Sequence, residues 1–345
     1  MKKNSQKVLV CMSGGVDSSV AATLLVDQSY DVTGAFMINY DQGDGQCWKP
    51  EYQDALRVSA KLGIQLLKLD FTEQYEKQVL EYMYKQYKAG RTPNPDVLCN
   101  KFIKFGVWLD KIKELGFNKM ATGHYARTEN GHLLLVKDRA KDQTYFLHQL
   151  NKKQLSQTIF PLGDHTKQEV RELAKKFDLP TAEKSESMGI CFIGEVPMKE
   201  FLQKKIKPNP GDIVMNGSSE ILGKHQGLAF YTIGQRHLNI HGLENQALYV
   251  LDKDQTKNQL IVGHEDDPLL YKTEIKTEKL HWISGQMPKF PLKCKVRLRH
   301  QQSLQDCTLD KNRLIKFTKP QRAITPGQFA VFYLKNQCLG GGVIK

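Results

Sequence analysis

The 345-residue sequence has no run of about 18 apolar residues, so it offers no membrane-spanning helix. It also lacks an export signal, because the apolar run at residues 8–12 is too short for an h-region and leads directly into a glycine turn. We therefore expect a cytoplasmic protein.

Closely spaced cysteines are missing as well. The seven cysteines form no CxxC pair, which argues against a disulfide framework and against a structural zinc site. No metal site is expected from them, and any special cysteine should be catalytic or redox-active while most are small core residues. They are Cys11, Cys47, Cys99, Cys191, Cys294, Cys307 and Cys338.

The sequence contains no repeat and no low-complexity tract, and its 40% hydrophobic and 25% charged residues are typical of globular domains. Its charge is less ordinary. Fifty Lys and Arg against 37 Asp and Glu give a net charge of +13. A polyanionic partner such as nucleic acid would explain this excess, and a generally basic proteome is the alternative.

The first 205 or so residues alternate short apolar runs with helical patterns, which indicates βαβ units. A capping box, Thr166 with Glu169, marks the start of one helix. The predicted strands cover residues 8–12, 31–38, 64–70 and 119–126, and the predicted helices cover 17–27, 51–62, 73–88, 102–115 and 166–177. The pattern predicts an α/β fold with a doubly wound, Rossmann-like parallel sheet, which binds ligands at the carboxyl ends of its strands.

After residues 204–211 the pattern changes to short strands with polar turns. A hairpin is predicted at 247–263, and the later strands, at 292–299, 304–309, 314–318, 328–334 and 338–344, indicate a small barrel or sandwich. We expect a catalytic domain at 1–205, a small, mostly β central domain at 206–272 and a C-terminal β-barrel at 273–345.

The strongest local motif lies between the first predicted strand and helix: Ser13-Gly14-Gly15-Val16-Asp17-Ser18-Ser19. Two glycines permit a tight turn close to a ligand, and the helix start offers N–H groups and a positive dipole end to a phosphate. The serine hydroxyls can donate to phosphate, and Asp17 can hold the turn or help to place Mg²⁺. The motif has neither the Walker A lysine nor a GxGxxG pattern. The alternative is an ordinary glycine turn capped by Ser18 or Asp17.

This motif resembles the pyrophosphatase loop (PP-loop) of enzymes that use ATP to adenylate a carbonyl oxygen. Three further segments extend the resemblance, at residues 94–100 (NPDVLCN), 188–193 (MGICFI) and 231–236 (YTIGQR). Together they resemble the bacterial tRNA-specific 2-thiouridylase family over almost the whole chain. Cys11, in place of a smaller residue, and the segment 39–48 depart from the family pattern, which affects only the detail of the adenine pocket.

The resemblance implies ATP and Mg²⁺ as cofactors, adenylation of the C2 oxygen of an anticodon wobble uridine, and sulfur transfer from a cysteine persulfide. It also implies the anticodon arm of tRNAs for Lys, Glu and Gln as substrate, and a cysteine desulfurase or sulfur-relay protein as sulfur donor. Two cysteines suit such chemistry, since one can carry sulfur and the other can resolve the disulfide. Another PP-loop ligase and a noncatalytic tRNA-binding persulfide carrier remain the alternatives.

Three residues are implied as catalytic: Cys191 as persulfide carrier, Cys99 as its partner, and Asp96 beside the target base. From the residues alone, Cys99 precedes a helical pattern, an arrangement that can lower a thiol pKa and expose it. Cys191 reads equally as part of a buried strand, and Asp96 as a turn former after Pro95.

The resemblance further implies ligand contacts. Those with ATP are Cys11, Met12, Ser13, Gly14, Gly15, Val16, Asp17, Ser18, Met37 and Gly123. Those with the target base or tRNA are Asn94, Pro95, Asp96, His124, Lys141, Asp142, Gln143, Arg299, His300 and Gln328. A structural histidine is the alternative for His124, and a solvated helix start is the alternative for residues 141–143.

One basic feature needs no analogy. In residues 293–299 the basic side chains Lys293, Lys295, Arg297 and Arg299 alternate with apolar ones. One strand face would then carry four positive charges while the other enters a core. We expect this stripe to bind phosphate, with a solvated edge strand as the alternative.

Overall fold

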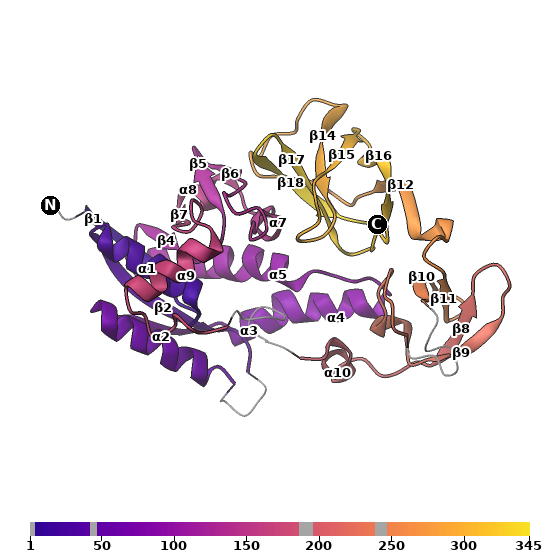
Figure 1. Cartoon of the computed structure of the whole chain (residues 1–345), viewed down its shortest axis with the longest axis horizontal. Coiled ribbons are helices and arrows are strands. Elements are labelled where there is room, and N and C mark those ends of the chain that lie inside the picture. Colours follow the sequence, from indigo (N-terminus) through magenta and orange to yellow (C-terminus); the bar gives the residue numbers. More distant parts are fainter. Residues whose placement is uncertain (1–3, 42–46, 186–195, 239–246) are drawn as a thin grey trace.

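The computed structural model describes residues 4–41, 47–185, 196–238 and 247–345 (Figure 1). Its N-terminal part is built on a five-stranded sheet with the order β3-β2-β1-β4-β7 and parallel pairing throughout. The strands are β1 (Asn4–Cys11), β2 (Tyr30–Ile38), β3 (Leu66–Asp70), β4 (Lys119–Ala121) and β7 (Thr158–Ile159). The predicted parallel sheet is confirmed, although the strand expected at 119–126 already ends at Ala121.

Helices cover both faces of this sheet because the apolar residues of β1 and β2 alternate in direction. Val8 and Val10 pack with Phe36 against α1 and α2, whereas Leu9 and Met37 pack on the opposite side. On the first side lie α1 (Val16–Asp27) and α2 (Lys49–Leu62). On the second lie two long helices, α3-η1-α4 (Thr72–Tyr75, Glu76–Leu80, Glu81–Lys88) and α5-η2-α6 (Pro95–Leu98, Cys99–Val107, Trp108–Glu114).

Among the remaining helices, α9 (Lys167–Lys176) is the longest. Its capping box is present as expected, since Glu169 N–H donates to Thr166 Oγ1 at 3.2 Å and Thr166 N–H donates to Glu169 Oε2 at 2.6 Å. The others are α7 (Thr144–Leu147), α8 (Lys152–Ser156) and α10 (Met198–Gln203), together with the single 3₁₀ turns η3 (Leu228–Phe230) and η4 (Pro268–Leu270). Among the residues that the structure describes, none of the helices has the length and apolar character needed to cross a membrane.

The central part is a four-stranded sheet with the order β10-β11-β8-β9. The predicted hairpin is confirmed, because β10 and β11 pair antiparallel from Asp254 with Gln259 to Tyr249 with Gly263. The strands are β8 (Gly211–Met215), β9 (Ile221–His225), β10 (Tyr249–Asp254) and β11 (Gln259–Gly263).

The C-terminal part is an antiparallel barrel that lies over α5 in Figure 1. Its strands are β12 (Tyr271–Lys276), β13 (His281–Trp282), β14 (Leu292–Arg297), β15 (Gln305–Leu309), β16 (Leu314–Arg322), β17 (Phe329–Leu334) and β18 (Gln337–Val343). A bridge between Thr277 and Ile344 joins the chain after β12 to the chain after β18.

The barrel sheet extends into the N-terminal part. The hairpin of β5 (Arg127–Glu129) and β6 (His132–Leu134) pairs with β18, through Leu133 with Cys338 and Leu134 with Gln337. This shared sheet fixes the barrel against the domain that carries the glycine loop.

The expected four-charge stripe on β14 is wrong at its third position. Lys293 and Lys295 are exposed, but Arg297 is only 6% exposed and its guanidinium donates to Asp142 at 3.2 Å. The strand ends at Arg297, so Arg299 no longer continues the alternation. Arg297 is buried because the end of β14 packs against the N-terminal part, a neighbour that strand periodicity does not reveal.

Candidate active site

The glycine loop between β1 and α1 has a conformation that requires glycine. Gly14 has φ of +74°, and a Cβ atom there would lie 2.2 Å from the backbone carbonyl oxygen of Glu51 in α2. Gly15 is the residue before α1, and it has no side chain to cap the helix. Ser18 caps the turn, as the alternative expected, because its hydroxyl accepts from the Ser13 N–H and donates to the Gly15 carbonyl, whereas Asp17 pairs with Lys167. The N-terminus of α1 is open to an anion.

Two serines hold the loop together. The Ser13 N–H donates to Ser18 Oγ at 3.1 Å, and the Ser18 hydroxyl donates to the carbonyl of Gly15, also at 3.1 Å. The hydroxyls of Ser13 and Ser18 lie 3.1 Å apart. Two hydroxyls and a helix start thus converge, as expected for a phosphate site.

Two lysines from distant segments reach this loop, and the sequence pattern indicated neither. The Lys167 ammonium lies 2.7 Å from Asp17 Oδ1, which also accepts from the Tyr125 hydroxyl at 3.0 Å. The Lys184 ammonium donates to the Gly14 carbonyl at 3.1 Å and to Asp54 at 2.6 Å. The capping box could have drawn attention to Lys167, which opens α9, but no local signal marks Lys184.

The chain after β4 completes the rim around the loop. A Cβ atom on Gly123 would lie 2.8 Å from the backbone nitrogen of Ser18, so the predicted nucleotide contacts at Gly123 and in the loop adjoin each other. His124 lies nearby, with Nδ1 2.8 Å from the Thr122 hydroxyl, and its ring packs beside those of Phe105 and Phe160, at 5.9 and 6.3 Å between ring centres. Burial, with a smaller effect of the Lys104 charge, holds the pKa of His124 well below its ordinary value, so its imidazole is neutral.

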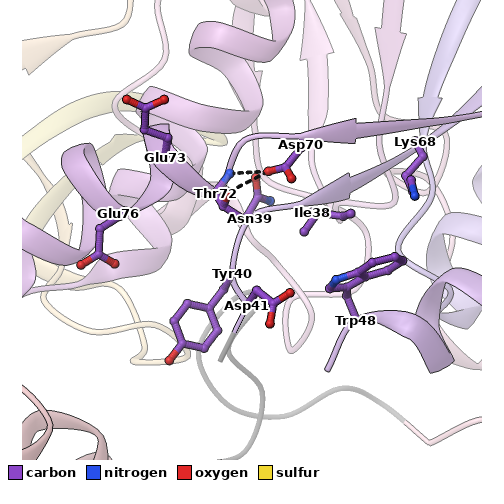
Figure 2. A pocket seen from close by; sticks show the side chains of 10 residues that line it. All are labelled: Ile38, Asn39, Tyr40, Asp41, Trp48, Lys68, Asp70, Thr72, Glu73 and Glu76. Atoms are coloured by element: carbon purple, nitrogen blue, oxygen red, sulfur yellow. Dashed lines mark hydrogen bonds between the residues drawn. The ribbon is translucent and has the colours of Figure 1, made fainter. Parts of the chain in front are cut away.

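A cavity of about 620 Å³ opens beyond the ends of β2 and β3 (Figure 2). Ile38, the last residue of β2, lines the cavity and directly follows the buried Met37. The ammonium of Lys68 lies 5.2 Å from the centre of the Trp48 ring. The lining residues are Ile38, Asn39, Tyr40, Asp41, Trp48, Lys68, Asp70, Thr72, Glu73 and Glu76. Four carboxylates against one lysine make this cavity unsuited to phosphate.

The segment before Cys99 forms the start of α5. Asn94 caps this helix by accepting from the Val97 N–H at 3.2 Å, and Pro95 occupies its first position. Asp96 follows in the first turn and is partly exposed. The expected exposure of Cys99 is wrong, because helix formation begins at Pro95 and the second turn places the Cys99 side chain, 0% exposed, in the main core.

Gln328 of the barrel contacts the chain just before this helix. Its amide donates to the carbonyls of Thr92 at 3.1 Å and Pro93 at 3.4 Å, and it accepts from the Asn94 amide at 3.3 Å. The central part also approaches this point, because the hydroxyls of Thr92 and Thr232 lie 3.4 Å apart. The predicted site residues Asn94 and Gln328 are therefore brought together.

Residues 141–143 contact the chain beside His124 through Gln143 and the end of β14 through Asp142. The Gln143 side chain accepts from the Tyr125 N–H at 2.9 Å, next to His124. The structure gives Asp142 a structural role: it is 1% exposed, and it accepts from Arg297, from the Val136 N–H and from the Thr144 hydroxyl.

The other predicted RNA contacts lie at the edge of the barrel. Arg299 donates to the carbonyl of Ala323, and burial lowers the pKa of its guanidinium. The ring of His300 lies 4.3 Å from that of Phe146, and burial lowers its pKa to about 4. Cys191 and the rest of residues 188–193 lie outside the described residues.

Three family models match the chain. They are described as a tRNA methyl transferase HUP domain at residues 6–195, a tRNA methyl transferase PRC-barrel domain at 199–264 and an aminomethyltransferase beta-barrel domain at 272–344. Their order agrees with the parallel sheet, the small central sheet and the C-terminal barrel.

Relatives that match over nearly the whole chain identify the family more narrowly than the domain models do. The chain is 47% identical to a tRNA-specific 2-thiouridylase of Legionella pneumophila strain Lens, with 98% of both chains covered. It is 46% identical to the protein of the same name from Francisella tularensis, with 99% of both covered. Among solved structures, a 4-thiouridine synthetase in complex with RNA and ATP matches with a TM-score of 0.39 and 16% identity, over 58% of this chain and 50% of that one.

Proposed function

Since the chain belongs to the tRNA-specific 2-thiouridylase family, we propose that its glycine loop binds ATP and that Cys99 and Cys191 carry out the sulfur transfer. The observation that supports this most directly is the loop itself. The Gly15 N–H, the two serine hydroxyls and the start of α1 lie together there, and such a group of donors suits phosphate.

The residues around the loop fit a nucleotide triphosphate. Ser13, Ser18 and the N–H groups at the start of α1 would donate to its oxygens, and Lys167 and Lys184 supply positive charge close by. When bound, ATP would turn the C2 oxygen of the uridine into a leaving group. Met37 and Gly123 would contact the rest of the nucleotide.

Magnesium would enter with the phosphates. In the part of the chain that the structure describes, no group of three or more His, Cys, Asp or Glu is arranged to hold a metal ion. Asp17 is the loop carboxylate that we propose for the ion, and its oxygens would then face both the ion and the Lys167 ammonium.

The sulfur chemistry needs two thiols. The terminal sulfur of a Cys191 persulfide would attack C2 of the activated uridine, forming a C–S bond while the C–O bond to AMP breaks. The Cys99 thiol would then attack the sulfur of Cys191, which leaves sulfur on the base and a disulfide between the two cysteines. Asp96 would accept the N3 proton of the uridine during activation. Because Cys99 is fully buried, the core around it must open when tRNA binds.

The substrate and partners follow from the same proposal. We propose the wobble uridine of tRNAs for Lys, Glu and Gln as target, and a cysteine desulfurase or relay protein as sulfur donor. Lys141, Gln143, Arg299, His300, Gln328 and His124 would position the anticodon arm, and the reaction would take place in the cytoplasm. The target base must leave its stack to reach the glycine loop.

Incubation of the purified protein with unmodified tRNA, ATP, magnesium and a persulfide source, followed by nucleoside mass spectrometry, tests the proposal. We expect an oxygen-to-sulfur mass change in uridine for the wild type and none for Cys99→Ser or Cys191→Ser, with tRNA binding retained. Cys47→Ser is the matched control, because Cys47 is exposed, and it should remain active. Thiolation that survives both Cys99→Ser and Cys191→Ser would remove the two-thiol mechanism.

A further inference from the structure

Lys184 is the one described residue that joins the glycine loop to α2 through its side chain ammonium. Its Nζ donates to the carbonyl oxygen of Gly14 at 3.1 Å and to Asp54 Oδ2 at 2.6 Å. Both side chains are largely covered, with 27% of Lys184 and 22% of Asp54 exposed. A half-buried ion pair that also contacts the loop backbone is more restricted than a surface pair.

The contact falls on the peptide plane between two glycines, whose orientation the backbone itself restrains little. Gly14 and Gly15 flank it, and glycine accepts both signs of φ, so the Gly14–Gly15 peptide plane can flip at little energetic expense. A peptide bond is planar and trans, which means that the oxygen of Gly14 and the N–H of Gly15 point in opposite directions. Fixing the oxygen therefore fixes the N–H.

The opposite side of this peptide is the side of the serine hydroxyls. The Gly15 N–H points to Ser13 Oγ at the long distance of 3.4 Å, and Ser13 Oγ lies 3.1 Å from Ser18 Oγ. A long hydrogen bond of this kind is readily exchanged for a shorter one to an anionic oxygen. With the oxygen of Gly14 held by Lys184, the Gly15 N–H stays beside the serine hydroxyls.

The second lysine at the loop acts differently. Lys167 pairs with the side chain of Asp17, whereas Lys184 contacts a backbone carbonyl and takes its own position from Asp54. Because Asp54 belongs to α2, which also contacts Gly14 through Glu51, the ion pair and the backbone contact hold the loop from the same side.

We propose that Lys184 is a positioning residue for ATP, which holds the Gly14–Gly15 peptide in the orientation that presents the Gly15 N–H to the phosphates. This inference rests on the proposed ATP site. It concerns affinity for the nucleotide and not the sulfur step.

Equilibrium binding of ATP with magnesium to the full-length protein tests it. Lys184→Met should weaken ATP binding roughly tenfold or more, as for loss of one charge-assisted hydrogen bond, and Lys184→Arg should restore most of the affinity. In thiolation assays Lys184→Met should raise the KM for ATP and leave kcat within about threefold of the wild type, with the affinity for tRNA unchanged. Lys175→Met is the matched control, because Lys175 pairs with Glu183 in an exposed ion pair, and its ATP affinity should equal that of the wild type.

Asp54→Asn keeps the lysine but removes its anchor, so it should weaken ATP binding less than Lys184→Met does, and the two changes together should not add. This variant keeps the test decisive if Lys184→Met does not fold. A wild type that binds no ATP would overturn the proposed function. A wild type that binds ATP, with Lys184→Met or Asp54→Asn equal to it, would overturn only the role of Lys184.

Discussion

The buried pair of Asp142 and Arg297 illustrates how single residues connect the parts of this molecule. Asp142 is 1% and Arg297 6% exposed, and the arginine also lies over the ring of Tyr333. The carboxylate accepts further hydrogen bonds from the Val136 N–H and the Thr144 hydroxyl. A buried charge pair of this kind is stable because each charge has partners, so loss of either partner leaves the other uncompensated.

We therefore predict that Asp142→Asn or Arg297→Met alone lowers the free energy of unfolding by about 3–5 kcal/mol. The double variant should lose less than the two single losses together, since no unpaired charge then remains. Lys295→Met is the matched control on the same strand: its pair with Asp306, at 2.8 Å, is exposed, and its removal should change stability by only about 0–1 kcal/mol. Denaturant unfolding measures all four variants. Equal effects of Lys295→Met and Arg297→Met would contradict this account.

The sequence predicts individual residues well where local chemistry decides and poorly where tertiary neighbours decide. The alternation of β14 correctly exposes Lys293 and Lys295, but Arg297 is covered by the segment around Asp142, some 155 residues away along the chain. The helical pattern after Cys99 predicts an accessible thiol, yet Cys99 is buried because the helix starts earlier, at Pro95.

At the scale of elements, the junction of β1 with α1 depends on the backbone of α2. Gly14 has φ of +74°, and its missing side chain leaves room for the carbonyl of Glu51. Gly63, which caps the other end of α2, has a similar φ of +66°, but a Cβ atom there would have no neighbouring atom within 4 Å. A comparison of alanine substitutions at these two positions therefore separates the effect of backbone strain from the effect of a steric clash.

Gly63→Ala should lower stability only by the strain of a left-handed alanine, about 1–2 kcal/mol. Gly14→Ala should lower it further and should also abolish measurable ATP binding, because the loop must move away from α2. Thermal unfolding and equilibrium ATP binding check the pair. If Gly14→Ala binds ATP as well as Gly63→Ala does, the close contact with α2 does not shape the site.

Element boundaries can be predicted where the sequence carries explicit signals. The capping box places α9, and the polar turn at 253–258 places the hairpin of β10 and β11. The pairing of β6 with β18 could not be predicted, because β5 and β6 are three residues each and their partner comes from the other end of the chain. Strand order likewise depends on which faces pack together, and periodicity reports only that a face is apolar.

At the scale of the whole molecule, the three parts meet at the start of α5. The barrel reaches it through Gln328, and the central part reaches it through Thr232, so the chain that leads into Asp96 and Cys99 is held by both. The change of pattern after residues 204–211 predicts the overall α/β and barrel architecture. It does not predict that these segments meet, since nothing in the sequence of one segment indicates which other segments it contacts.

The net charge of +13 belongs to the whole molecule, and its distribution decides how RNA binds. With Arg297 buried, the basic face of β14 is reduced to Lys293 and Lys295, both exposed. If this face binds phosphates of the tRNA, Lys293→Gln with Lys295→Gln should weaken binding and reduce the slope of log K against log salt by about one for each phosphate that is no longer bound. Lys111→Gln with Lys113→Gln on α6 removes the same two charges from a different surface, and it should leave the slope nearly unchanged. Because both double variants lower the net charge equally, a general effect of charge would change the two slopes equally. Filter binding of unmodified tRNA at several salt concentrations distinguishes these outcomes, and equal slopes in the two variants would exclude β14 as a phosphate-binding face.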